Sequence, residues 1–287
     1  MGTIKTVAIV SKPGIERGYQ LVPELVEWLE GRGVNVRLDE QTALYAGRTS
    51  FFSREEVPDR AQIVVVLGGD GTLLAAARAV GGREIPLFPV NLGGLGFLTA
   101  ITADEIYVEL ERAFRGEHRI GHRRMLRCEL RRGGDLVADY EALNDVVITK
   151  SALARMIDLE THVDHHFVCT YKADGLIIST PTGSTAYSLS AGGPIIFPHV
   201  AATCITPICP HMLTNRPVLV PDASVIRIFN KAEDRTAYLT IDGQVGISLV
   251  EEDEIVCMRS EKQIHLIRPP KMRFFDVLRE KLSWGER

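Results

Sequence analysis

Residues 63–80 read IVVVLGGDGTLLAAARAV and hold a strand, a glycine-rich loop and a helix in direct succession. The run Ile63–Leu67 contains only branched apolar residues, as expected of a parallel strand that is buried on both faces. The stretch Leu73–Val80 favours a helix and ends at the Gly81-Gly82 pair, a common helix stop. A strand that leads through a tight loop into a helix is the unit of open parallel sheets, so this stretch predicts an α/β domain.

The same alternation of strands and helices continues on both sides of this stretch. Upstream, a strand at Val7–Val10 is followed by a helix at Tyr19–Glu30 and a strand at Val34–Leu38. Downstream, a strand at Pro86–Asn91 precedes a helix that opens with a capping box of Thr102 and Glu105. We therefore expect residues 1–120 to form an α/β domain with an open, mostly parallel sheet and covering helices.

The pattern of the sequence changes after residue 120. Leu126, Cys128 and Leu130 alternate with charged residues, and the Gly133-Gly134 turn leads into a further strand at Leu136–Tyr140. Only the stretch after Ser184 looks helical, so residues 121–268 are predicted to form a β-rich, mostly antiparallel second domain. Its other strands are expected at Val146–Ile148, Asp158–Val163, Phe167–Tyr171, Leu176–Ser179, Val218–Val220, Val225–Phe229, Tyr238–Ile241 and Ile264–Ile267.

The last residues, 269–287, return to helical spacing. Phe274, Leu278 and Leu282 fall on one face of this segment. We expect it to form a C-terminal helix that packs back on the first domain.

Composition excludes several classes of protein. The chain has 287 residues, 45% of them hydrophobic, and a formal net charge of -4, which is ordinary for a cytoplasmic globular protein and unsuited to binding nucleic acid. Its longest apolar runs are too short to span a membrane. The five cysteines are odd in number and form no C-x-x-C motif, as expected in a reducing compartment.

The loop Gly68-Gly69-Asp70-Gly71-Thr72 has the features of a phosphate site. Its glycines allow a sharp turn and a close approach of the ligand, and the following helix offers unpaired N–H groups to an anion. A carboxylate would repel phosphate, so Asp70 makes sense as a base towards a hydroxyl or as a ligand of Mg²⁺. The alternative is a glycine-rich turn in which Asp70 only caps the helix.

This loop resembles the GGDGT motif that NAD kinases share with diacylglycerol and sphingosine kinases. The resemblance implies that Asp70 is the catalytic proton acceptor and that Gly68, Gly69, Gly71 and Thr72 form the phosphate loop. The motif alone leaves the acceptor substrate open.

Two later segments resemble bacterial NAD kinases more specifically. They are Leu143–Val146, which reads LNDV, and Ala173–Pro194, which contains TPTGSTAYSLSAGGP. The resemblance implies an NAD site made by Asp70, Gly71, Phe97, Asn144, Asp145, Arg155, Lys172, Asp174, Thr185, Ala186, Tyr187, Ser188, Leu189, Ser190, Asp242 and Gln244.

The residue types fit these roles. An amide at Asn144 suits a base edge, the carboxylate of Asp145 accepts from ribose hydroxyls, and Tyr187 offers a flat apolar face. Arg155 and Lys172 would neutralise phosphate charge. Each residue also has a plainer interpretation: Asn-Asp as a turn, Tyr187 as a core aromatic, and the two cations as solvated charges. Asp242 with Gly243 also forms a good hairpin turn.

Two other polar clusters are set aside. The histidines at 162, 165 and 166 flank a predicted turn, and the acidic run Glu251–Glu254 is expected to be a solvated turn.

The expected reaction is transfer of the γ-phosphoryl group of ATP to the 2′-hydroxyl of the adenosine ribose of NAD, giving NADP and ADP. Mg²⁺ would enter with ATP, without an assigned protein ligand. The resemblance further implies a homodimer or homotetramer. Two alternatives stay open: a lipid or sphingoid kinase that shares the loop, and a non-catalytic NAD(P) sensor.

Overall fold

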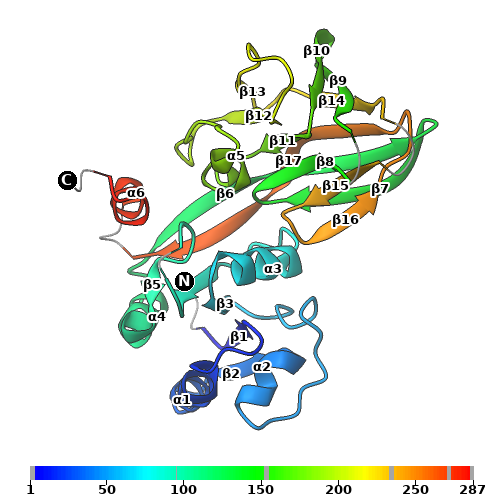
Figure 1. Ribbon diagram of the computed structural model, residues 1–287. Coiled ribbons are helices and arrows are strands. Elements are labelled where there is room, and N and C mark those ends of the chain that lie inside the picture. The colour runs from blue at the N-terminus through cyan, green and yellow to red at the C-terminus, as the bar shows by residue number, and fades with distance from the viewer. Residues whose placement is uncertain (1–3, 95, 152–154, 233–235, 270–272, 285–287) are drawn as a thin grey trace. The chain divides into compact units, whose positions relative to one another are not determined.

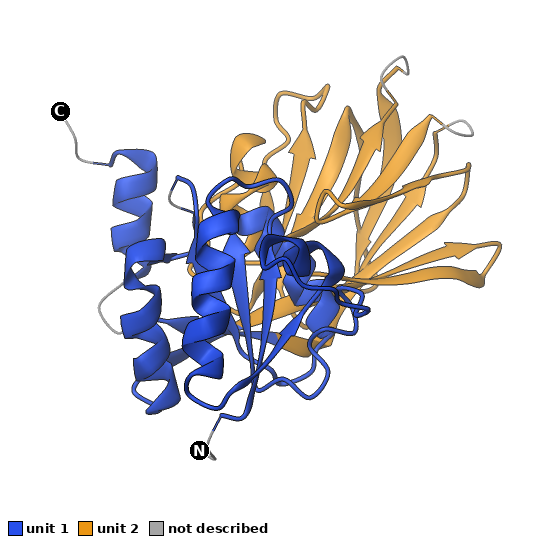
Figure 2. Cartoon of the chain, turned by 90° about the horizontal axis from the view of Figure 1, so that it is seen from below, with its two compact units in different colours: residues 1–122, 264–287 blue, residues 123–263 orange. Residues whose placement is uncertain are grey.

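The computed structural model describes residues 4–94, 96–151, 155–232, 236–269 and 273–284. The chain divides into two compact units, shown in different colours in Figure 2. Unit 1 combines Met1–His122 with Ile264–Arg287, and unit 2 is the continuous segment Arg123–Gln263.

Unit 1 is built on a parallel sheet in the order β2-β1-β3-β4 (Figure 1). The bounds are β1 (Thr6–Ser11), β2 (Asn35–Leu38), β3 (Ile63–Gly68) and β4 (Leu87–Asn91), and the short β5 (Ile101–Thr102) also pairs with β4. All six residues of β3 are buried, as its continuous apolar run predicts.

The helices of unit 1 explain this burial. They are α1 (Gly18–Glu30), α2 (Glu40–Tyr45), α3 (Asp70–Val80), α4 (Ile106–Phe114) and α6 (Phe274–Leu282), with a short 3-10 turn at Ala103–Glu105. Ile63, Val65 and Leu67 share one apolar core with residues of α1 and α4. Val64 and Val66 are equally buried but point to the other face. Helix α3 packs against β1, β3 and β4. The Thr102–Glu105 capping box is present as expected.

Unit 2 contains a six-stranded antiparallel sheet in the order β13-β12-β11-β8-β15-β16. Its members are β8 (Asp145–Lys150), β11 (Gly175–Ser179), β12 (Ala202–Ile208), β13 (Val218–Pro221), β15 (Ala237–Ile241) and β16 (Val245–Ser248). Between β11 and β12 the chain forms a 3-10 turn, Gly183–Thr185, and the short helix α5, Tyr187–Ser190.

The remaining strands of unit 2 pair antiparallel in the order β10-β9-β14-β17. They are β9 (Ile157–Val163), β10 (His166–Ala173), β14 (Ile226–Asn230) and β17 (Glu254–Arg268), and the hairpin of β6 (Arg119–Arg132) and β7 (Asp135–Ala142) joins them through β6. Inward residues of both groups, such as Ile148 and Ile178 on one side and Leu159 and Ile228 on the other, form a single core.

These observations confirm the expected fold class, an α/β N-terminal part and a β-rich C-terminal part. Glycines 133 and 134 make the β6–β7 turn with φ values of +57° and +91°. Strand β12 was not expected, because Pro207 interrupts its pattern. Residues Ala202–Ile205 pair with β13, and Pro207 lies beyond them. The absence of an N–H group at Pro207 therefore removes no backbone hydrogen bond between β12 and β13.

The expectation of a solvated acidic turn at 251–254 is wrong for Asp253. Asp253 is fully buried, and its carboxylate accepts two hydrogen bonds from Arg132, at 2.8 and 2.9 Å. A buried carboxylate needs such a paired partner. Sequence pattern alone does not reveal it, because Arg132 lies 121 residues away along the chain.

No helix within the described ranges is both long enough and apolar enough to cross a membrane.

Candidate functional site

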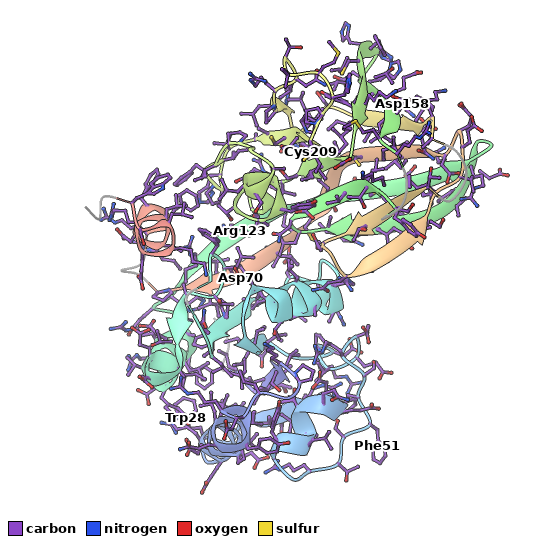
Figure 3. The ribbon with its side chains drawn as sticks, viewed as in Figure 1. Trp28, Phe51, Asp70, Arg123, Asp158 and Cys209 are labelled. Carbon is purple, nitrogen blue, oxygen red and sulfur yellow. The ribbon has the colours of Figure 1, made fainter. Side chains whose placement is uncertain are left out.

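The glycine-rich loop of unit 1 joins β3 to α3. Gly69 has an extended backbone and precedes the first turn of the helix, which Asp70 opens (Figure 3). A Cβ at Gly68 would overlap the Thr72 side chain, so this position is restricted to glycine. At Gly69 and Gly71, no described atom lies within 4 Å of an added Cβ. Space for a side chain is therefore closed at Gly68 and open at Gly69 and Gly71.

The carboxylate of Asp70 is bound by a second loop of unit 1. Its Oδ2 accepts the N–H of Phe97 at 2.9 Å. Its Oδ1 accepts the N–H of Leu98 at 3.2 Å, and both the N–H and the hydroxyl of Thr99, at 3.2 and 3.1 Å. These four bonds orient the carboxylate group and place Phe97 beside it.

The approach of this loop to Asp70 depends on Gly96. A Cβ at Gly96 would overlap Asp70 Oδ1 and Thr99 Oγ1. Asn91, at the end of β4, holds the same loop from below: its Nδ2 donates to Gly94 O at 2.8 Å and to Thr99 Oγ1 at 3.1 Å. Gly96 is therefore a packing requirement of the Asp70 site.

A cavity of about 410 Å³ lies in unit 2. Its floor comes from alternate residues of two paired strands: Val147 and Thr149 of β8 and Thr240 of β15, which lies opposite Val147. The other residues of β8, such as Val146 and Ile148, point into the core on the opposite face. The full lining is Asn144, Asp145, Val147, Thr149, Ala186, Tyr187, Thr240, Asp242 and Gly243.

Two carboxyl groups lie at one end of this cavity. Asp145 is only 4% exposed, and burial together with the neighbouring charge of Asp242 raises the pKa of its carboxyl to about 7. Asp242 accepts hydrogen bonds from the N–H groups of Leu143, Asn144 and Asp145, at 2.9, 2.7 and 3.1 Å. The two aspartates therefore differ in their environment, because three backbone N–H groups hold the carboxylate of Asp242.

The side-chain oxygen of Asn144 is a hydrogen-bond acceptor that lies at the same cavity. It is 8% exposed, and among the described residues none donates a hydrogen bond to its buried Oδ1. Buried polar atoms are rarely left unpaired in folded proteins, so this atom fits a donor on a bound ligand, such as an exocyclic amino group.

Tyr187 forms a side of the cavity at the start of α5. Its ring is 44% exposed, which excludes the alternative of a core aromatic. The helix turn beneath it is anchored: Ser188 is buried and its hydroxyl bonds Thr206 of β12 at 2.9 Å. Gly183 permits the close approach of this segment to Asn144, because a Cβ there would overlap the Asn144 backbone.

The cavity thus combines five of the residues that the family resemblance implied: Asn144, Asp145, Ala186, Tyr187 and Asp242. Asp70, Gly71 and Phe97 belong to unit 1 and are grouped around the glycine-rich loop. Val147, Thr149, Thr240 and Gly243 were not expected. Strand alternation could have found two of them, since Val147 and Thr149 follow Asp145 at spacings of two.

The other implied residues lie outside the cavity lining. Arg155 and Lys172 are exposed, and Asp174 forms an ion pair with Lys150 at 2.9 Å, a partner that sequence reasoning missed. Thr185 donates to Thr182 O, Leu189 is half-buried, and Ser190 and Gln244 are exposed.

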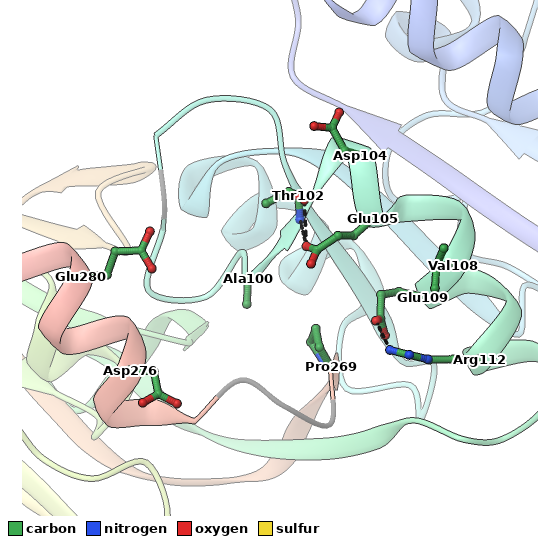
Figure 4. Close-up of a pocket in the computed structure, with 10 residues that line it drawn as sticks. All are labelled: Ala100, Thr102, Asp104, Glu105, Val108, Glu109, Arg112, Pro269, Asp276 and Glu280. Carbon is green, nitrogen blue, oxygen red and sulfur yellow. Dashed lines mark hydrogen bonds and ion pairs between the residues drawn. The ribbon is translucent and has the colours of Figure 1, made fainter.

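A larger cavity, about 550 Å³, lies elsewhere in unit 1 (Figure 4). Five acidic residues line it against one arginine: Asp104, Glu105, Glu109, Asp276 and Glu280, with Arg112. Glu105 accepts from Thr102 in the capping box, and Glu109 pairs with Arg112. This excess of negative charge disfavours a polyphosphate ligand.

Comparisons with known proteins agree with both units. The model of the ATP-NAD kinase N-terminal domain matches residues 7–118, and that of the ATP-NAD kinase C-terminal domain matches residues 143–269. The NAD kinase of Solibacter usitatus is 65% identical over 287 residues, which is 100% of both chains.

Two solved structures are similar to the chain over almost its full length. Yeast NADH kinase, complexed with NADH, has a TM-score of 0.92 at 25% identity, covering 100% of this chain and 89% of that one. An NAD kinase from Archaeoglobus fulgidus, in complex with ATP, has a TM-score of 0.78 at 27% identity, covering 98% of this chain and 100% of that one.

Proposed function

This chain belongs to the ATP-NAD kinase family, and from that membership we propose how its residues transfer the γ-phosphoryl group of ATP to NAD. The reaction is that of a phosphotransferase, with NADP and ADP as products. Membership of this family excludes the lipid kinase and the non-catalytic sensor that the sequence had left open.

We propose that unit 2 binds NAD in the cavity beside β8. Asn144 Oδ1 would accept from the adenine amino group, the Asp145 carboxylate would accept from ribose hydroxyls, and the Tyr187 ring would stack on a flat part of the dinucleotide. The observation that carries this assignment is the meeting of a buried free acceptor, a buried carboxyl and an exposed aromatic ring in one cavity.

We propose that Asp70 is the general base. The described residues donate three hydrogen bonds to Oδ1 and one to Oδ2, so we assign the remaining lone pair of Oδ2 to the incoming hydroxyl. The 2′-hydroxyl proton passes to Oδ2 as the ribose oxygen bonds to the γ-phosphorus. The bond between that phosphorus and the bridging oxygen breaks, and ADP leaves with the electron pair.

The phosphates of ATP are assigned to Gly68, Gly69, Gly71 and Thr72, where the helix N-terminus and two unobstructed glycines support an anion. No group of three or more His, Cys, Asp or Glu side chains within the described residues has the arrangement of a metal site. We propose that Mg²⁺ arrives as part of the substrate, bound to the ATP phosphates.

The remaining expectations continue as parts of this proposal. We assign the phosphate loop to a domain of residues 1–120, NAD to residues 121–268, and a packing role to the C-terminal helix in 269–287. All five cysteines are free thiols, which fits a reducing cytoplasm. We propose a homodimer or homotetramer, with neither nucleic acid nor membrane as a partner.

The direct test incubates the purified chain with ATP, Mg²⁺ and NAD and measures NADP with an NADP-specific dehydrogenase. We expect NADP and ADP to form in equal amounts. The Asp70→Asn variant serves as the control, because it keeps the shape of the side chain. Release of ADP without NADP in the wild-type chain would contradict the proposal.

A further inference from the structure

The carboxylate of Asp242 accepts hydrogen bonds from three backbone N–H groups. Asp242 and Gly243 form the β15–β16 turn, with φ values of +50° and +65°. Positive φ is common for glycine but unusual for aspartate, and such residues cluster at functional sites. In this conformation the side chain reaches the N–H groups of Leu143, Asn144 and Asp145 at 2.7–3.1 Å.

Two of these three residues, Leu143 and Asn144, are also bonded by Thr180. Its hydroxyl donates to Leu143 O at 2.6 Å, and its N–H donates to Asn144 O at 2.9 Å. Asp145 O in turn accepts the N–H of Asp242 at 3.0 Å. Asp242 therefore accepts from all three N–H groups and donates to Asp145 O, while Thr180 donates to the other two carbonyl oxygens. The backbone beneath the two proposed NAD-binding side chains is fixed by these bonds.

We propose that Asp242 is a positioning residue, which acts on NAD through the backbone and charge of Asn144 and Asp145 and makes no contact with NAD itself. This inference rests on the proposed binding of NAD in the unit 2 cavity. It differs from the role that family resemblance implied, in which Asp242 belongs to the set of NAD ligands.

The charge of Asp242 gives this role a measurable consequence. The titratable residues that line the cavity are Asp145, Asp242 and Tyr187. The negative charge of Asp242 is the second cause, after burial, of the raised pKa of Asp145. Replacing Asp242 by a neutral residue removes this repulsion, so Asp145 should ionise at lower pH.

The test compares Asp242→Asn with a matched control, Asp164→Asn. Asp164 also lies in a hairpin turn of unit 2 at positive φ, +54°, and also accepts a backbone N–H, that of Val225, at 2.9 Å. It does not line the cavity. An asparagine at 242 can still accept from Asn144 and Asp145 through one oxygen, but it loses the charge and the bond from Leu143.

We expect Asp242→Asn to raise the KM for NAD about tenfold, from the loss of one charge-assisted hydrogen bond, with the KM for ATP changed less than about twofold. The pH at which kcat/KM for NAD reaches half its plateau should fall. Asp164→Asn should change neither quantity. Asp242→Ala, which removes the acceptor altogether, should be more impaired than Asp242→Asn.

A double-mutant cycle separates positioning from direct contact. In an Asp145→Ala background, we expect Asp242→Asn to raise the KM for NAD by less than about threefold. The Asp145 carboxylate, through which Asp242 mainly acts in this proposal, is absent from that background. A direct ligand would lose the same tenfold in both backgrounds, and that result would overturn the proposal. So would an unchanged KM for NAD in Asp242→Asn.

Thermal unfolding of the same variants identifies a purely structural role. A melting temperature far below that of Asp164→Asn, with both KM values raised together and the pH midpoint unmoved, would also overturn the proposal. Failure of the proposed function is recognised separately, because the wild-type chain would then make no NADP.

Discussion

Asp70 is the first residue of α3 in unit 1, and Asp145 is the first residue of β8 in unit 2. The two aspartates differ in burial and in the hydrogen bonds that their carboxyl groups accept. Asp70 is half-buried, and its carboxylate accepts four hydrogen bonds from the Phe97–Thr99 loop. Asp145 is almost fully buried, and none of the described residues donates to its carboxylate, because the nearby backbone N–H groups bond Asp242 instead.

The difference shows how one residue type serves two tasks. A carboxylate held by several donors is fixed in place, as a base that must meet one hydroxyl requires. A carboxyl that is buried without donors keeps its lone pairs for a ligand, and the cost is a pKa raised to about 7. In the proposed mechanism, the protein itself orients Asp70, whereas Asp145 receives its hydrogen bonds from the ligand.

The largest effect is expected at Asp70. Asp70→Asn preserves shape but removes the base and its charge, so turnover should fall by roughly 10²–10⁴ while NAD binding changes little. Steady-state kinetics with an NAD titration provides the measurement. Near wild-type turnover would show that Asp70 is not the base, and the contrast between Asp70 and Asp145 would then have no functional meaning.

Asp145→Ala should affect binding first. Loss of charge-assisted hydrogen bonds to ribose hydroxyls suggests about 1.5–3 kcal/mol, or roughly 10- to 150-fold in NAD affinity, with ATP affinity nearly unchanged. Calorimetric titration of each substrate tests this. Weaker ATP binding with intact NAD binding would reverse the assignment of the two units.

Gly96→Ala tests whether the loop prepares Asp70. The added methyl group would overlap Asp70 Oδ1 and Thr99 Oγ1, so we expect a loss of about tenfold in kcat, from displacement of the base. Gly93→Ala is the matched control, because Gly93 lies in the same loop and no described atom lies within 4 Å of its added Cβ. Equal kinetics for the two variants would show that the loop does not orient Asp70.

Tyr187 is expected to have a smaller effect, confined to unit 2. Tyr187→Ala should raise the KM for NAD by about 3- to 10-fold, since stacking contributes on the order of 1 kcal/mol, and Tyr187→Phe should be close to wild type. The melting temperature should hardly change, because the ring is 44% exposed. A buried aromatic would instead cost roughly 3–5 kcal/mol on truncation.

The smallest effect concerns stability. Folding raises the pKa of Asp145 to about 7. The folded protein therefore loses stability as the pH rises from the pKa of this group in the unfolded chain towards about 7. Asp145→Asn removes this ionisation, so its melting temperature should exceed that of the wild-type chain by about 2–4 °C at pH 8, with no gain at pH 4. The measurement is a pair of thermal scans without ligand. A lower melting temperature at pH 8 would show that Asp145 is not strained by its burial.

The sequence predicts those parts of the candidate site that depend on residues close together in the chain. The GGDGT loop lies within ten residues of its strand and helix, and the β8 segment shows its inward and outward faces by alternation. The sequence does not predict hydrogen bonds between residues that lie far apart in the chain. Asp70 binds residues 27–29 positions away, and Asp242 binds residues 97–99 positions away.

This limit explains why the contacts of Asp242 and Gly96 do not follow from the sequence. The sequence resemblance groups Asp242 with the residues of the NAD site, and the structure adds its bonds to the N–H groups of Leu143, Asn144 and Asp145. The sequence does not reveal that a side chain at Gly96 would collide with the carboxylate of Asp70. Both roles follow from tertiary contacts, which no local pattern carries.

The connectivity of unit 1 has a consequence for the order in which the molecule is made. Leu266 of β17 pairs with Leu87 of β4, so two residues of one unit are separated by the whole of unit 2. A chain that emerges from the ribosome N-terminus first therefore leaves part of the β4 edge unpaired until residue 266 is synthesised. Unit 2, a continuous segment, is free to complete its core earlier. The last unit to mature during translation is thus the one that begins first, and its phosphate loop acquires a finished sheet only near the end of synthesis.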